Sequence, residues 1–390
     1  MSTVIKAAGP ARFLSLVPHL LGFHPTRSLV LVPFSGRRSV GAMRFDLPSA
    51  DRADDVERSA STCIGMVCRL PDADALALVV YTDDSLHRAD DSVPHHAFVR
   101  AIAARADACG IEVRDALCVG ADAWTAYPDD GAAPRLGDLS EVAAPAADDL
   151  PPVRAGDQSA GAELPPVADE AAHPVAAALR ALDQAVRTVC ADDSAEPGAD
   201  ERTIATLGRL DPQALTAACR LDELPALFED ALAWDPSALA PFEAATLIWC
   251  LARPALRDIA LVQWCGTLAD GEAALDAQLQ WEGGADYPAD LGMRMWGEGT
   301  RPDRDRLSRA LELARHAAAL APDAVRPGAL ATCAWLSWAL GRSTHAESFA
   351  RRACELEPEH GLGEIVRSFV AVGHVPDWAF RGETGRRGRR

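Results

Sequence analysis

Side chains that could do chemistry gather in the stretch from Leu16 to Pro48. A short turn places His24 and Arg27 just before a hydrophobic segment, and Arg44 and Asp46 follow in the next one. If the two segments pair as neighbouring strands, an imidazole, a guanidinium and a carboxylate meet in one place. Such a set could bind an anion or support general acid–base catalysis.

The same side chains also have a structural interpretation. His24 and Arg27 would cap the end of the preceding helix, and Arg44 would pair with Asp46 or another neighbour. Isolated polar side chains beside a sheet edge usually serve local structure, which favours this interpretation. The four residues therefore remain candidate site residues, catalytic or ligand-binding, without an assigned role.

No familiar reaction motif accompanies them. The sequence has no dinucleotide-binding glycine fingerprint, no phosphate loop with its lysine, no Gly-x-Ser-x-Gly and no His-Glu-x-x-His. We expect no cofactor, and whether the protein is an enzyme stays open.

Two further groups of residues could suggest a metal site. One is a polar connection that lacks the spacing of metal ligands and is predicted to be a solvated loop; its residues are Asp83, Asp84, Asp90, Asp91, His95 and His96. The other is the set of ten cysteines, which never form a Cys-x-x-Cys pair and are predicted to be buried, reduced thiols. We expect no metal ion.

The elements that must position the four candidate residues can be read from hydrophobic spacing. An apolar helix is predicted over 14–21, with Gly22 as its stop. Residues 28–34 are apolar on both faces, as in a central strand, whereas 39–47 alternate between apolar and polar side chains. This pattern predicts a hairpin that carries Arg44 and Asp46 on one face.

Helices and strands continue to alternate after this hairpin. Helices are predicted over 53–70 and 96–109, a buried strand over 75–82, and one or two strands between 113 and 127. This order predicts a mixed α/β sheet with helices packed on it, as a first domain spanning 1–127.

The rest of the chain changes character twice. Residues 128–174 are rich in proline, alanine and aspartate and are predicted to be a linker or a poorly ordered insertion. No convincing strand follows, so 175–300 is predicted to be helical. The last residues, 379–390, form a basic tail.

An internal repeat lies in 301–378. The segment 310–323 aligns without gaps to 346–359, an offset of 36 residues. Small residues at matching positions and a proline near the end of each segment, Pro322 and Pro358, are typical of tetratricopeptide-like helix pairs. We expect these helices to pack on 175–300, with a capping box formed by Thr344 and Glu347. Core packing is expected for Trp234, Trp249, Trp264, Trp281 and Trp296.

Charge and composition narrow the function further. A formal charge of −19 over 390 residues opposes binding to nucleic acid. The apolar runs are too short to cross a membrane and no leader peptide is evident, so we expect a cytoplasmic protein. All basic residues except Lys6 are arginine, which suggests a GC-rich, actinobacterial source.

The chain resembles an actinobacterial family catalogued as domain of unknown function 4192. The resemblance rests on LLGFHPTRSLV at 20–30, MRFDLP at 43–48 and AWLSWALGR at 334–342. It implies a fold but no activity. The positions that match its motif are Gly22, Phe23, Pro25, Ser28, Arg44 and Asp46.

Two hypotheses on function follow. The first is an interaction or regulatory protein whose helical domain binds a protein partner in a groove. The alternative is an enzyme or small-ligand sensor with its site at His24, Arg27, Arg44 and Asp46. The first is favoured by the helix-pair repeat and by the lack of a reaction motif.

Overall fold

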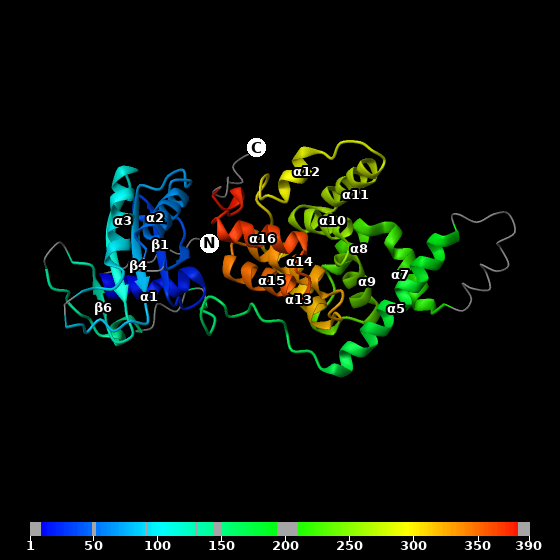
Figure 1. Cartoon of the computed structure of the whole chain (residues 1–390), viewed down its shortest axis with the longest axis horizontal. Coiled ribbons are helices and arrows are strands. Elements are labelled where there is room, and N and C mark those ends of the chain that lie inside the picture. The colour runs from blue at the N-terminus through cyan, green and yellow to red at the C-terminus, as the bar shows by residue number, and fades with distance from the viewer. Residues whose placement is uncertain are drawn as a thin grey trace, which may run out of the picture. The chain divides into compact units, whose positions relative to one another are not determined.

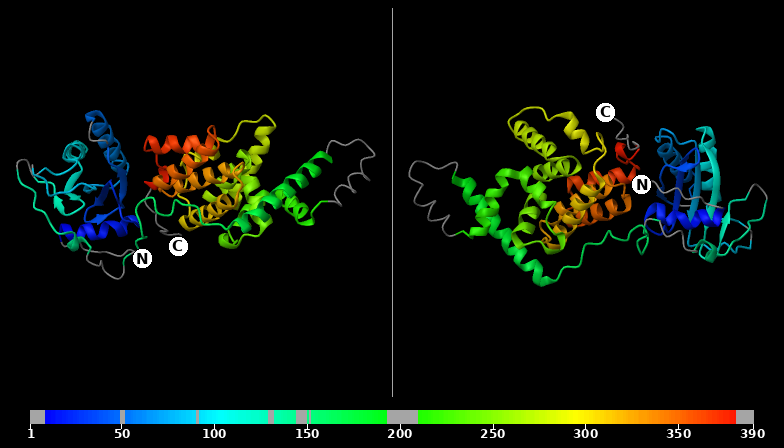
Figure 2. Two further views of the ribbon diagram at one scale, coloured as in Figure 1. Left: turned by 60° about the horizontal axis from the view of Figure 1, so that its bottom comes forward. Right: turned by 180° about the vertical axis from the view of Figure 1, so that it is seen from behind.

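The computed structural model describes residues 9–48, 52–89, 92–128, 132–143, 150, 152–192 and 210–380. The chain divides into two compact units, with the boundary between Ala160 and Gly161. The first unit is a sheet with helices, and the second is an assembly of helices (Figures 1 and 2).

A single mixed sheet forms the centre of the first unit. Its order is β2-β1-β4-β5-β6, and β3 also pairs with β1. β4 and β5 are parallel, and the other neighbouring strands are antiparallel. The strands are β1 Ser28–Ser35, β2 Arg38–Ser39, β3 Met43–Asp46, β4 Ala75–Tyr81, β5 Glu112–Val119 and β6 Trp124–Ala126.

Helices cover both faces of this sheet, which explains why β1 and β4 are buried throughout most of their length. Helix α1, Pro10–Leu21, packs on the face that carries Val30 and Val79. Helices α2, Ala53–Val67, and α3, His96–Ala108, pack on the opposite face. The predicted mixed α/β fold is confirmed.

The predicted alternation in the second strand of the hairpin is confirmed as well. Met43, Phe45 and Leu47 pack towards the core beneath α2 and α3. Arg44 lies opposite Val30 in the register of β1 and β3, so its side chain belongs to the α1 face. This alternation brings Arg44 and Asp46 to one side of the sheet.

Parts of 128–174 have definite structure. The short helix α4, Leu139–Val142, is capped by Asp138, and Gly137 bridges to Trp124. The backbone amide of Arg154 donates to the carbonyl of Gly22. The boundary between the units falls inside this segment.

Helices are the only regular secondary structure among the described residues of the second unit. Its α-helices are α5 Asp169–Asp192, α7 Pro212–Cys219, α8 Leu224–Ala231, α9 Pro241–Leu251, α10 Pro254–Cys265, α11 Leu268–Glu282, α12 Ala289–Arg294, α13 Arg304–Leu320, α14 Arg326–Ala339, α15 Ser343–Leu356 and α16 Gly361–Ala371. Proline stands in the first turn of several of them, where its missing N–H costs nothing. Pro236 begins a 3-10 turn, Pro236–Ala238, and not an α-helix.

One hydrophobic core joins α8–α10 to α13–α16. The two repeated segments lie in α13 and α15, and each helix from α13 to α16 packs on the next. Trp264, Trp335 and Trp338 are fully buried in this core.

Three sequence expectations were wrong in part. Helix α15 is preceded by Arg342 and has no side-chain cap, so the capping box at Thr344 does not form. Trp281 and Trp296 are 55% and 50% exposed: Trp281 lies in the last turn of α11 and Trp296 follows the short helix α12, and neither side chain enters the core.

The third concerns the cysteines. All ten are free, but Cys68, Cys109, Cys190 and Cys219 are exposed. These four lie at or near helix ends, where the core does not cover them. None of the helices in the described residues is long and apolar enough to span a bilayer. Of the basic tail, residues 381–390 lie outside the described residues.

Candidate functional site

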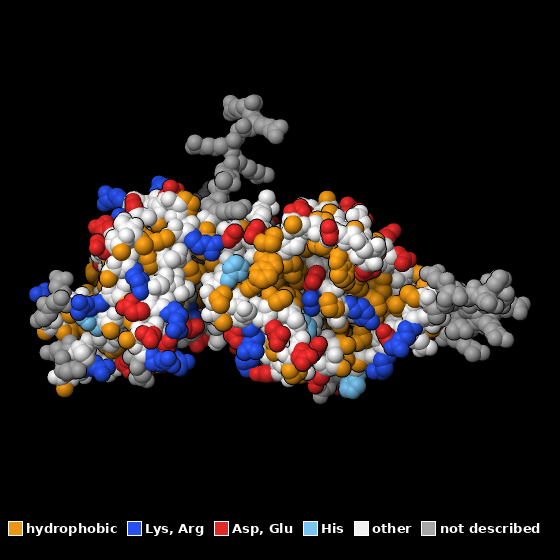
Figure 3. All heavy atoms as spheres, turned by 45° about the horizontal axis from the view of Figure 1, so that its top comes forward, with side chains coloured by type: hydrophobic (Ala, Val, Ile, Leu, Met, Phe, Trp, Pro, Cys, Tyr) orange, Lys and Arg blue, Asp and Glu red, His pale blue; other side chains and the backbone are white. Residues whose placement is uncertain are grey.

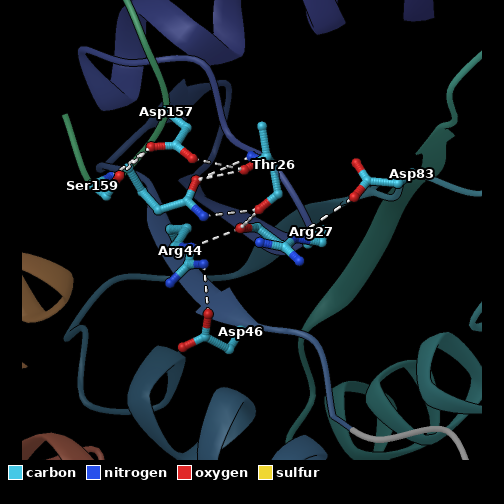
Figure 4. A network of polar contacts seen from close by, with 9 residues as sticks. Thr26, Arg27, Arg44, Asp46, Asp83, Asp157 and Ser159 are labelled. Carbon is cyan, nitrogen blue, oxygen red and sulfur yellow. Dashed lines mark hydrogen bonds and ion pairs between the residues drawn. The ribbon is translucent and has the colours of Figure 1, made fainter.

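The predicted polar cluster forms around Arg44 at the start of β1. The Arg44 Nε donates to the Ser28 hydroxyl at 2.7 Å, and a terminal guanidinium nitrogen lies 2.6 Å from Asp46 Oδ1. The Arg44 side chain is only 11% exposed, whereas that of Asp46 is 84% exposed. Figure 4 shows the Arg44 guanidinium directed towards Asp46.

Arg27 and His24 stand at the margin of the cluster. Arg27 pairs with Asp83 at 3.7 Å, and both side chains are 74% exposed. Its φ of 43° is unusual for a residue other than glycine. His24 is exposed, and among the described residues its recorded hydrogen bond is through the backbone amide, to the Gly156 carbonyl. The structure therefore joins Arg44 to Asp46 but leaves Arg27 and His24 apart from that pair.

The segment 154–159, which the sequence did not single out, lies beside Thr26 at the start of β1. The side-chain amide of Gln158 accepts from the Thr26 N–H and donates to the Thr26 carbonyl, both at 3.1 Å. The hydroxyl and amide of Ser159 hold the pKa of Asp157 below its usual range. Figure 4 shows Asp157 and Ser159 beside Thr26. The Asp-Gln-Ser run after Gly156 was a turn signal that composition obscured.

The cluster thus satisfies its own hydrogen-bonding groups. Ser28 receives from Arg44 and donates to the Thr26 carbonyl at 2.6 Å, so its hydroxyl is fully used. Arg44 is not among the residues that line the hollow of about 510 Å³ in the second unit. The geometry favours a structural role for the cluster. It holds residues 26–28, where the chain enters β1 (the strand entry), against β3 and against the segment 154–159.

The predicted solvated loop after β4 is organised by Asp122, which the sequence did not single out. This carboxylate accepts from the Leu86 amide at 2.8 Å and from the Ser85 hydroxyl at 2.5 Å. Ser85 is the main cause that lowers its pKa to about 2. In the described residues no set of three or more His, Cys, Asp or Glu side chains is arranged to hold a metal ion. Asp90 and Asp91 lie outside them.

A hollow of about 510 Å³ lies in the second unit. We call it the helical hollow. The turn between α9 and α10, the turn after α12, and the first residues of α14 and α16 line it. Its polar lining residues are Arg257, Asp258, Glu357, Glu359 and His360. The described lining contains no serine, threonine, cysteine or lysine, so it offers no hydroxyl, thiol or amine nucleophile.

The start of α14 comes very close to the end of α9. A Cβ atom on Gly328 would lie 2.2 Å from the Leu251 carbonyl oxygen. Only glycine permits this approach. Pro254 and Pro327 begin α10 and α14 on either side. The floor of the helical hollow is therefore built from tightly packed backbone.

Two charged residues and a histidine form the polar part of the hollow. Arg257 is 6% exposed and its Nε donates to Asp258 Oδ1 at 2.9 Å. Loss of hydration raises the pKa of Asp258, against the attraction of Arg257. His360 is 7% exposed, and its Nδ1 accepts from the Gly363 amide at 3.2 Å. Burial, and next the Arg257 charge, lower the pKa of His360, so its neutral form is favoured.

The outer part of the hollow is apolar and acidic. The Trp296 indole is 50% exposed and lies 5.1 Å from the Phe369 ring, measured between centroids. Ile365 of α16 is 42% exposed. Glu357 and Glu359 are exposed beside them. Figure 3 shows hydrophobic side chains gathered over the helical unit, with acidic ones at their margin.

Comparisons with known proteins give a family and no activity. The model of a domain of unknown function, DUF4192, matches residues 10–286, which run from α1 into the residues after α11. The likeness noted at 334–342 lies beyond this match. No curated protein and no solved structure matches the chain. Because the match covers more than half of its length, the chain belongs to the family described as domain of unknown function DUF4192.

Proposed function

We propose that this is an interaction protein whose helical hollow binds a basic segment of a partner polypeptide. The observation that carries the proposal is the half-exposed Trp296 indole at the edge of a concave site. Tryptophan gains much free energy when a partner covers it, and it is enriched among the residues that dominate binding. Ile365 adds apolar area beside it.

The charge of the lining supports a basic partner. The Arg257 charge is neutralised by Asp258. Glu357 and Glu359 form no ion pair with an arginine or lysine in the described part of the chain. A partner's arginine or lysine would therefore meet two unpaired carboxylates and the face of the Trp296 ring, which attracts cations. The net charge of −19 adds long-range attraction for a basic segment.

The helix arrangement supports a finer proposal. Helices α13 to α16 pack in succession, and the repeated segments in α13 and α15 are offset by 36 residues. We propose that 301–378 is tetratricopeptide-like, and that the arginine-rich composition reflects an actinobacterial source. The alternative function is an enzyme or small-ligand sensor with its site at His24, Arg27, Arg44 and Asp46. It has less support because Arg44 bonds to Asp46 and Arg27 pairs with Asp83.

A peptide-binding measurement with the full chain tests the proposal. The probe is a short, fluorescein-labelled synthetic peptide of leucine and arginine, and its control replaces every arginine with glutamate. We expect the basic peptide to bind with micromolar affinity, less tightly at high salt, and the acidic peptide not to bind.

Matched variants locate the binding. Trp296→Ala should weaken the basic peptide by about tenfold or more, as expected for a central aromatic anchor. Trp281→Ala removes an indole of similar exposure that does not line the hollow, and it should leave affinity unchanged. The double change Glu357→Gln with Glu359→Gln should remove most of the salt dependence. Equal binding of the acidic peptide, or no effect of Trp296→Ala, would overturn the proposal.

A further inference from the structure

Helices α2 and α3 lie side by side on the same face of the sheet in the first unit (Figure 1). Arg105 of α3 donates to the backbone carbonyl of Glu57 in α2 at 3.2 Å and pairs with its carboxylate. Each helix leads directly into one of the two parallel strands, β4 and β5, whose starts are paired at Ala75 and Glu112. The C-terminal ends of both helices therefore lie at the end of the sheet where β4 and β5 begin.

A cysteine follows each helix at that end of the sheet. Cys68 comes directly after α2 and Cys109 directly after α3, and both are exposed. The Cys109 thiol lies near enough to that of Cys68 to act on it. Partial loss of hydration, and next the Cys109 thiol, raise the pKa of Cys68. Both cysteines are therefore exposed to solvent and lie near each other.

Four other cysteines lack either exposure to solvent or a recorded neighbouring thiol. Cys63 and Cys118 are buried, and burial raises the pKa of each to about 12. Cys190 and Cys219 are exposed, but no contact with another thiol is recorded for them among the described residues. Exposure and a neighbouring thiol occur together at Cys68 and Cys109.

We propose that Cys68 and Cys109 form a reversible disulfide that joins α2 to α3, with a low-molecular-weight disulfide as the oxidant. The proposal does not depend on the helical hollow. One cysteine, as thiolate, attacks the oxidant, forms a mixed disulfide and releases one small thiol. The second cysteine then attacks the protein sulfur of that mixed disulfide and releases the second small thiol. The protein loses two protons and two electrons, and the oxidant gains them as it is reduced to two small thiols.

Position explains why this step is favoured. Once one cysteine carries the mixed disulfide, the other is already beside it, so the second displacement is intramolecular and fast. The sulfur atoms must still move to bonding distance, about 2.05 Å, which exposed side chains can do by rotation. The product would fix the two helix ends just before β4 and β5, and a cross-link between distant residues stabilises the folded chain.

The reaction can be followed with the full chain and glutathione disulfide. After incubation at pH 8 and alkylation of the remaining thiols, peptide mass mapping should show residues 68 and 109 cross-linked, with a loss of two hydrogens. Dithiothreitol should reverse it. Oxidation should raise the midpoint of thermal unfolding by a few degrees, and it should be faster at pH 9 than at pH 7 because the thiolate is the nucleophile.

Single variants separate pairing from simple exposure. In Cys68→Ser, Cys109 should stop at the stable mixed disulfide with glutathione, as we also expect for the exposed Cys190 and Cys219 of the wild type. The rise in midpoint should disappear. Cys190→Ser should leave the cross-link intact. A wild-type protein in which Cys68 and Cys109 keep glutathione would overturn the pairing. A cross-link that leaves the unfolding midpoint unchanged would overturn the stabilising role.

Discussion

The polar cluster of the first unit and the helical hollow of the second differ in how far their side chains already bond to one another within the protein. The cluster has the residue types of an active site, but Arg44, Ser28 and Asp46 bond to one another. The hollow has no reaction motif, but it keeps a half-exposed indole and two carboxylates without an ion-pair partner in the described residues. In this protein, side chains that can still bind another molecule therefore indicate a site better than the types of residue present.

The largest effect should come from the floor of the helical hollow. In Gly328→Ala the new methyl group would meet the backbone of Leu251 and Ala252, which cannot move aside cheaply. We expect the free energy of unfolding to fall by about 2–4 kcal/mol, as for other overpacked sites. Urea unfolding measures it.

Gly361 provides the control inside the same hollow. A Cβ atom there would meet nothing within 4 Å. Gly361→Ala should therefore change stability by less than about 0.5 kcal/mol. If both alanine variants proved equally stable, the close approach of α14 to α9 would not hold.

Within the polar cluster, loss of the buried Arg44 guanidinium should lower the free energy of unfolding most. Arg44→Ala removes the donors to Ser28 and Asp46 from a side chain that is 11% exposed. We expect a loss of about 1–3 kcal/mol in the free energy of unfolding. Arg27→Ala, in an ion pair exposed at 74% on both sides, should cost less than about 0.5 kcal/mol. Similar costs for both would mean that the cluster is not organised around Arg44.

Much of the first unit could be predicted from the sequence, because its signals are local. Apolar runs on both faces identified β1 and β4, and alternation in 43–47 placed Arg44 and Asp46 on one face. Gly22 ended α1 with a φ of 82°, as glycine after a helix commonly does. The predicted helix over 53–70 ends at Val67, since Cys68 to Asp74 form the turns before β4.

The candidate sites were harder to predict because their partners are distant in sequence. Thr26 meets Gln158 across more than a hundred residues, and the hollow unites Arg257, Trp296 and His360 from three separate helix ends. Spacing along the chain carries no signal for such contacts. The exposure of Trp296 likewise depends on packing in three dimensions, so a tryptophan expected in the core became the main candidate for binding.

A pH measurement sharpens the description of the hollow. Burial lowers the pKa of His360 below its ordinary 6.5, so the unfolded chain takes up a proton at a higher pH than the folded one. Stability from this group is therefore present above about pH 6.5 and is lost as the pH falls through the lower folded pKa. Protonation would also remove the Nδ1 acceptor that caps α16.

The variant His360→Asn isolates this effect, since asparagine can still cap the helix but does not titrate. Its stability should fall less than that of the wild type between pH 7 and pH 5, measured by urea unfolding. Asp258 shifts the opposite way, because its raised folded pKa favours the folded chain when protonated. Both proteins keep Asp258, whose pKa depends first on burial, next on Arg257 and last on His360, so the difference between them reports mainly on His360. Parallel pH profiles would contradict a buried, neutral imidazole.

The smallest effect should be local to the edge of the cluster. Gln158→Ala removes both hydrogen bonds that its side chain makes to the Thr26 backbone. Water can reach this partly buried site, so we expect the free energy of unfolding to fall by only about 0.5–1 kcal/mol. Hydrogen exchange at the Thr26 amide should nevertheless become faster, while exchange at Val79 in the middle of β4 stays unchanged. Ser159→Ala, which leaves both Thr26 bonds in place, serves as control. If exchange at Thr26 is equally slow in both variants, the segment 154–159 does not hold the strand entry, and the cluster depends on Arg44 alone.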